Sequence, residues 1–139
     1  MLRKPQPQRL TWAIILCPIV LIAMPGCRGA RPVTGGTTGT LTIGGKSYSD
    51  VQVTFHDADN ALVGFGVTDN NGNFELVTEG ARGPLWLPEG EYSVTLQSAG
   101  APLQFPAEYA SPDTTPLKIS WDGDPSADVE LKISSVPTT

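Results

Sequence analysis

Few side chains in this chain of 139 residues could carry out chemistry. His56 is the only histidine, and the only two cysteines, Cys17 and Cys27, both lie near the N-terminus. A structural zinc site takes four ligands, mostly cysteine and histidine, and a serine triad needs a histidine base next to its nucleophile. The sequence after Cys27 therefore excludes a zinc site built from several histidines or cysteines, and any triad would have to use His56.

His56 belongs to a segment in which apolar and polar residues alternate, and it falls in the polar phase with Gln52 and Thr54. We therefore expect a solvent-exposed surface histidine. The chain also lacks a G-x-S-x-G nucleophile elbow and a phosphate-binding glycine motif. We predict that the protein is not an enzyme and that it uses no cofactor.

Carboxylates occur in pairs at the spacing of turns, as in Asp57/Asp59, which favours solvated turn residues. The segment Asp69-x-Asn71-x-Asn73 superficially looks like the start of an EF-hand loop. Its glycine stands at loop position 4 rather than 6, and position 12 is Gly80 rather than glutamate, which excludes an EF-hand. A shallow calcium site that uses Asp57, Asp59 and Asp69 stays open as the alternative.

The N-terminus has the three parts of an export signal. Positive charges precede an apolar run, Leu10–Met24, and small residues follow it. The run is shorter than the about 20 residues that a spanning helix needs, and the pattern is typical of a signal peptide. We assign the signal to residues 1–26.

The end of this signal, Ala23-Met24-Pro25-Gly26-Cys27, resembles a lipobox, in which the cysteine receives diacylglycerol. Met24 and Pro25 depart from the usual residues of that motif. We predict that Cys27 carries a lipid and holds the protein at the cell envelope, with Arg28 indicating the outer membrane, facing the periplasm or the exterior. A signal cleaved without lipidation, or an uncleaved helix, remains the alternative.

The part of the chain after Cys27 is acidic. It holds all 14 acidic residues against six basic ones, for a net charge of −8. Proteins that bind nucleic acids gather lysine and arginine over the phosphates. We therefore expect no nucleic-acid partner.

Alternation of apolar and polar residues dominates the remainder and predicts β-strands with one buried face each. We expect an all-β fold, a roughly seven-stranded antiparallel sandwich over residues 39–133, with a flexible tether at 27–38 and a tail at 134–139. Within 61–67 we expect Val63, Phe65 and Val67 to face the core. The strand segments are 40–43, 51–56, 61–67, 73–76, 91–97, 117–121 and 129–134.

Turn residues separate these segments: Gly44-Gly45, Asp57–Asn60 and Asp69–Gly72 all favour tight turns. The stretch 98–116 is long and contains four prolines. Such a loop is either functional or a rigid crossing between sheets, and we favour the crossing.

Three motifs resemble those of carboxypeptidase regulatory-like domains: Gly39-Thr40-Leu41 with Gly44-Gly45-Lys46, the hairpin Thr68–Phe74, and the strand Pro88–Val94. Residues 105–117 resemble a late segment of small lipoproteins common in planctomycete bacteria. The resemblance implies a transthyretin-like (prealbumin-like, Ig-like) sandwich and a binding role without peptidase activity. In it Asp69 bonds turn amides, Gly72 takes a left-handed conformation, Phe74 enters the core, and the Tyr92 hydroxyl holds nearby backbone.

Two tryptophans follow different patterns. Trp121 is in phase with Leu117 and Ile119, so we expect it in the core. Trp86 lies in an apolar connector, where it either caps the end of the sandwich, which we favour, or binds a partner. We thus predict a lipid-anchored envelope module that contacts the membrane through its lipid and an envelope protein or glycan through its surface; a carrier or sensor of small ligands or calcium is the alternative.

Overall fold

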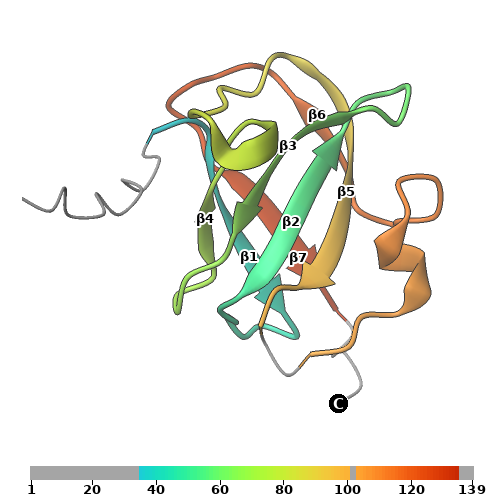
Figure 1. Cartoon of the computed structure of the whole chain (residues 1–139). Helices are drawn as coiled ribbons and strands as arrows, with labels where there is room; N and C mark the ends of the chain where they lie inside the picture. Colours follow the sequence, from blue (N-terminus) through green and yellow to red (C-terminus); the bar gives the residue numbers. More distant parts are fainter. Residues whose placement is uncertain (1–34, 101–102, 135–139) are drawn as a thin grey trace, which may run out of the picture. The chain divides into compact units, whose positions relative to one another are not determined.

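Seven strands form two sheets that face each other across an apolar interior (Figure 1). The computed structural model describes residues 35–100 and 103–134, which belong to one compact unit. One sheet has the order β4-β1-β7 and the other the order β3-β2-β5-β6. The strands are β1 (Thr38–Ile43), β2 (Val51–His56), β3 (Leu62–Val67), β4 (Asn73–Glu75), β5 (Gly90–Ser98), β6 (Lys118–Trp121) and β7 (Val129–Ile133).

The predicted all-β sandwich is confirmed, with one difference in strand direction. All neighbours in the four-stranded sheet are antiparallel, and so are β1 and β4. The first and last strands, β1 and β7, run parallel, with Gly39 opposite Val129 and Ile43 opposite Ile133. Because Thr38 starts β1 and Thr37 is 3% exposed, these two residues belong to the sandwich and not to the predicted tether.

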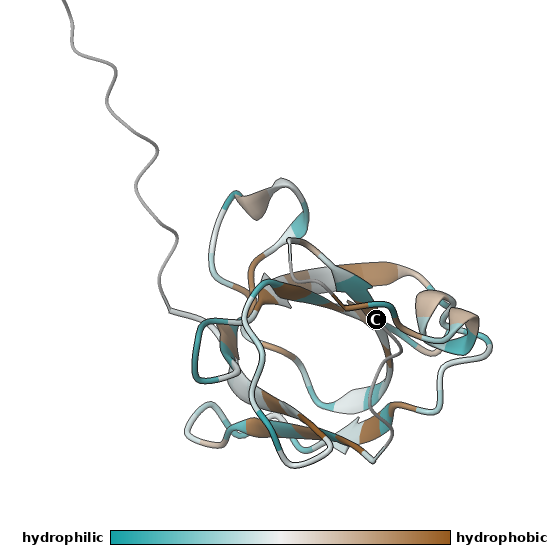
Figure 2. Cartoon of the chain, turned by 90° about the horizontal axis from the view of Figure 1, so that it is seen from below, coloured by the Kyte–Doolittle hydropathy of each residue, from teal (hydrophilic) through white to brown (hydrophobic). Residues whose placement is uncertain are grey.

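The alternation of residue types places one side of most strands in a shared core (Figure 2). Phe55 packs at its centre, with ring centroids 6.3 Å from Phe74 and 6.4 Å from Tyr92. Trp121 is also buried, as predicted, and its indole N–H donates to Leu87 O at 3.0 Å. Burial of these rings supplies the largest share of apolar area per residue.

The predicted phase of β3 is wrong. Gly64 and Gly66 face the interior, whereas Val63 and Phe65 are only partly buried and Val67 is 43% exposed. A Cβ at Gly64 would lie 2.5 Å from Val77 O, so the glycines let the backbone of the following segment pass close to β3. Backbone proximity, rather than hydrophobicity, decides which face of this strand is inside.

The turns follow the predicted chemistry. The Asp69 carboxylate accepts hydrogen bonds from the backbone N–H groups of Asn71 and Asn73, at 2.8 and 3.0 Å. Gly72 has φ 77°, the left-handed conformation that glycine adopts without strain. Asp57 does the same work at the β2–β3 turn, where it accepts from two backbone amides.

The proline-rich stretch is a packed segment on the outer face of β5. It contains a short 3-10 helix, η2 (Ala107–Ala110), whose Tyr109 is 6% exposed. Thr115 donates to Val94 O at 2.6 Å, and β5 is buried on both faces over 92–96. The stretch therefore connects β5 to its neighbour β6 by crossing the outside of the sheet, not by passing between sheets.

Candidate functional site

The three acids of the alternative calcium site do not converge. Asp57 and Asp59 lie in the turn before β3, and Asp69 lies in the turn after it. A six-residue strand is about 20 Å long, so one ion cannot reach both turns. No group of three or more potential metal ligands occurs within the described residues. The carboxylates of Asp57 and Asp69 accept from backbone amides, as the prediction of turn residues requires.

His56, expected as a solvent-exposed surface histidine, is only partly exposed. It ends β2, is half-buried, and its Nε2 forms a hydrogen bond with Thr95 Oγ1 at 3.1 Å. Its Nδ1 is buried and has no partner among the described residues. His56 lies opposite Ser93 on β5, and both Ser93 and Thr95 are buried, so this part of the outer face is not open to solvent. The bond from His56 to a threonine on the neighbouring strand is a cross-strand contact.

Ser93 and Lys118 form a close pair, with Lys118 Nζ donating to Ser93 Oγ at 2.7 Å. The same ammonium donates to Pro112 O at 2.7 Å, and Ser93 is 8% exposed. A serine nucleophile needs access to substrate and a base that accepts its proton. Lys118 instead acts as donor to two acceptors, so the pair holds the 103–117 stretch against β5.

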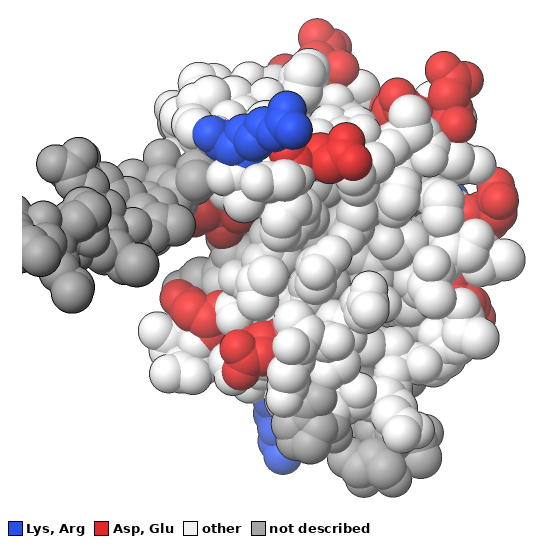
Figure 3. Space-filling model, viewed as in Figure 1, with Lys and Arg blue, Asp and Glu red and all other residues white. Residues whose placement is uncertain are grey.

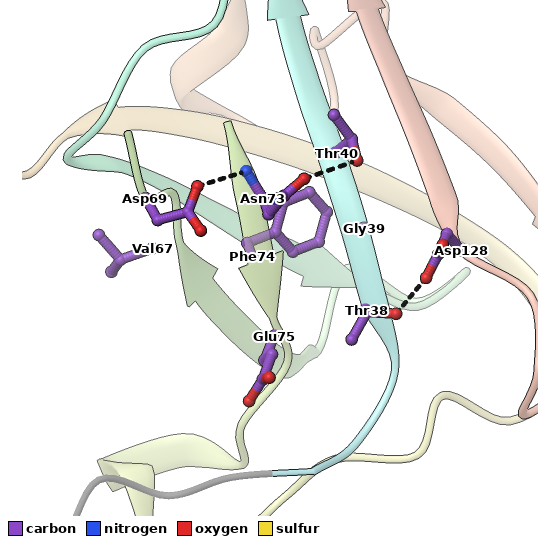
Figure 4. Close-up of a pocket in the computed structure, with 9 residues that line it drawn as sticks. All are labelled: Thr38, Gly39, Thr40, Val67, Asp69, Asn73, Phe74, Glu75 and Asp128. Atoms are coloured by element: carbon purple, nitrogen blue, oxygen red, sulfur yellow. Dashed lines mark hydrogen bonds between the residues drawn. The ribbon is translucent and has the colours of Figure 1, made fainter. Parts of the chain in front are cut away.

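A polar cleft opens where β4 and the end of β3 approach β1 (Figure 4), with a volume of about 640 Å³. Two pairs of side chains hold its walls together: Thr40 donates to Asn73 Oδ1 at 3.2 Å, and Thr38 donates to Asp128 Oδ1. The cleft is lined by Thr38, Gly39, Thr40, Val67, Asp69, Asn73, Phe74, Glu75 and Asp128.

The parallel pairing of β1 and β7 builds this cleft. Gly39 lies opposite Val129, which brings Asp128 next to Thr38 although 90 residues separate them. The side chain of Glu75 projects from β4, and its carboxylate has no hydrogen-bond or ion-pair partner in the part of the chain that the structure describes. The cleft thus offers hydroxyl, amide and carboxylate groups, and one of its carboxylates is uncommitted.

The chemistry of the cleft is that of hydrogen bonding. His56 lies on the other sheet, so no imidazole base serves the cleft. Asp69 and Asp128 are already bound to turn amides and to a hydroxyl. Hydroxyl and carboxylate groups in an open depression suit a polar ligand rich in hydroxyl or amide groups.

Compared with known protein families and with curated proteins, the chain gives no match. The candidate site therefore depends on its geometry alone.

The outer face of the four-stranded sheet is mostly uncharged at its centre (Figure 3). Most of the charged side chains in this view are acidic and lie around its margin. This face therefore presents carboxylates at its rim and uncharged side chains over β2 and β3 to any partner.

Trp86 is 55% exposed, so the interpretation of a cap over the end of the sandwich is wrong. Its neighbour Leu87 is 3% exposed and takes the buried position instead. Alternate residues of this extended connector point in opposite directions, so burial of Leu87 leaves the indole outside. The role of Trp86 in binding remains a prediction.

Tyr92 does what was predicted of it. Its hydroxyl donates to Pro88 O at 2.7 Å, and its ring is 7% exposed. Burial, with a smaller contribution from the Asp57 carboxylate, raises the pKa of the Tyr92 phenol above its ordinary value. The perturbed group holds backbone in place rather than facing a cleft, which indicates a structural role.

The sequence did not predict the cleft, although most of its lining residues stand in motifs and strands that it did predict. The motifs include Gly39, Thr40, Asp69, Asn73 and Phe74, but not Thr38, Glu75 or Asp128. The sequence shows Glu75 at the end of a predicted strand, but the residues that lie near it in the cleft are brought there by the pairing of the first and last strands.

Cys27 and the predicted signal peptide lie outside the described residues. Within those residues, no helix is long and apolar enough to cross a membrane.

Proposed function

We propose that this protein is a lipid-anchored binding module of the bacterial cell envelope, without catalytic activity. The observation that carries the binding role is the polar cleft at β1 and β4, with its uncommitted Glu75. The partner is an envelope glycan or protein that presents hydroxyl or amide groups. We further propose that the domain is of the carboxypeptidase regulatory-like, transthyretin-like type, on the strength of its hairpin and Pro-x-Gly-x-Tyr motifs.

The anchor is supported by the sequence. Cys27 follows a positively charged, apolar segment and a small residue, which is the order that lipid transfer to cysteine requires. One acyl chain binds a membrane only marginally, so stable attachment needs more than one chain. A lipidated Cys27 would confine the cleft to the envelope and to partners found there, with the outer membrane as the expected location.

The binding role is tested by capture from envelope fractions with the mature chain as bait. We expect Glu75→Ala to lose partners that wild type retains, because the change removes the uncommitted carboxylate of the cleft. Glu91→Ala is the matched control, since Glu91 is also an exposed strand glutamate but lies on β5 in the other sheet.

Retention of all partners by Glu75→Ala would exclude the cleft as the binding surface. Equal loss in both glutamate variants would mean that the capture depends on overall charge rather than on the cleft.

A further inference from the structure

Trp86 lies in a short extended connector whose two neighbours turn inward. Leu85 packs against the core and Leu87 is buried, while more than half of the indole is exposed. An exposed tryptophan is costly to leave in water and pairs an apolar body with one N–H donor. The Trp86 indole is therefore best matched by a partner that has an apolar interior and a hydrated boundary.

The connector that carries Trp86 is bonded to the point where the chain enters the sandwich. Thr37 N–H donates to Leu85 O at 2.8 Å, and Leu87 N–H donates to Thr37 Oγ1 at 2.8 Å. Thr37 therefore contacts the residues on both sides of Trp86. An anchor on the chain before Thr37 therefore restrains the end of the domain that carries the indole.

The segment before Thr37 limits how far this end can move from Cys27. An extended chain spans at most 3.6 Å per residue, so Cys27 and Thr37 can lie no more than about 36 Å apart. A short link of this kind gives an effective concentration in the millimolar range at the surface that holds it. At this effective concentration, a side chain whose affinity for lipid is too weak to hold a free protein at a membrane would still spend most of its time in contact with the lipid.

We propose that Trp86 inserts its indole into the interface of the membrane to which Cys27 is anchored, and so fixes which end of the domain faces the lipid. The proposal rests on the proposed lipid anchor. Tryptophan is enriched at the level of lipid headgroups, where the ring is buried and its N–H stays hydrated. The partner is thus a lipid surface, not a protein pocket.

The charges around this end favour a neutral lipid. Arg82 is the basic residue of the connector, whereas Glu79 and Glu89 flank it. An anionic surface would repel these carboxylates, so we expect the contact to be strongest with zwitterionic lipid.

The test couples the mature chain through the Cys27 thiol to maleimide lipid in phosphatidylcholine vesicles, so that attachment does not depend on natural lipidation. Some lipids carry brominated acyl chains, which quench tryptophan emission on contact. The mature chain has two tryptophans, Trp86 and Trp121, and Trp121 is buried in the core. We expect a loss of emission that Trp86→Phe abolishes, and a smaller loss in phosphatidylglycerol vesicles.

A second variant moves the indole to the opposite end of the sandwich. Asn70→Trp in the Trp86→Phe background places it in the β3–β4 turn, where Gly72 O accepts from Leu41 N–H, whereas the connector of Trp86 is bonded to Thr37. This variant should remain unquenched.

Equal emission loss in wild type and Trp86→Phe would overturn the proposal, as would equal quenching at both ends. Loss of a protein partner in Trp86→Ala without lipid quenching would assign the residue to protein binding instead. The natural anchor is tested separately, by the mass of the mature N-terminus.

Discussion

Tyr92 shows how one side chain joins local and global structure. Its ring packs edge-on against Phe55 in the core, and its hydroxyl donates to Pro88 O four residues earlier. The start of β5 is thereby fixed to the connector that carries Trp86. Removing the hydroxyl leaves the partly buried Pro88 carbonyl without this donor while keeping the ring.

We expect Tyr92→Phe to lower the free energy of unfolding by about 1 kcal/mol at neutral pH. The variant should also change the alkaline limb of stability. Because the folded protein raises the pKa of the phenol, the unfolded chain releases this proton first, near pH 10. The contribution to stability is complete below that pH and is lost as the pH rises through the folded pKa.

Urea unfolding at neutral and alkaline pH checks both effects. Wild type should lose more stability than Tyr92→Phe as the pH rises above about 10. Parallel pH profiles for the two proteins would show that the Tyr92 phenol does not contribute to the alkaline loss.

At the scale of elements, β3 is governed by its glycines. Gly64 faces the interior, and a Cβ there would lie 2.5 Å from Val77 O and 2.4 Å from Leu85 Cδ2. Val77 also pairs with Phe65 on the same strand, so its backbone cannot move away without losing two hydrogen bonds. The segment after β4 thus crosses from one sheet to the other against a glycine surface.

Gly64→Ala should therefore destabilise the protein by about 1–3 kcal/mol, the usual cost of overpacking. Gly83→Ala is the matched control, because nothing lies within 4 Å of its added Cβ, and it should change stability by less than about 0.5 kcal/mol. Thermal or urea unfolding of both variants measures the difference. Similar stability for the two would mean that β3 and the crossing segment have room to separate.

The strands and turns also show which parts of the fold could be predicted from the sequence. Alternation predicts all seven strands because each follows a rule of local spacing, and turn residues such as Asp69 and Gly72 act within their own loops. The phase of β3 was not predictable by this rule, because its glycines face the interior to make room for the backbone of Glu75 and Val77, which follow later in the chain. The cleft was not predictable either, because Thr38 meets Asp128 only through the parallel pairing of β1 with β7.

At the scale of the whole molecule, the described sandwich separates its reactive side chains. His56 is bonded to Thr95 on one sheet, the cleft carboxylates lie at the other, and Lys118 holds a packed loop. All three features lie on the same sandwich, which supports the surface that carries the cleft. Attachment to a membrane would give that surface its place and its orientation.

The most direct test of this account is the mass of the N-terminal peptide of the mature protein, purified from membranes of a bacterium that processes lipoproteins. We predict a peptide that begins at Cys27 and carries the added mass of a diacylglyceryl group, and no membrane-bound protein from the Cys27→Ala variant. A mature protein that begins at another residue, or an unmodified Cys27, would contradict the account.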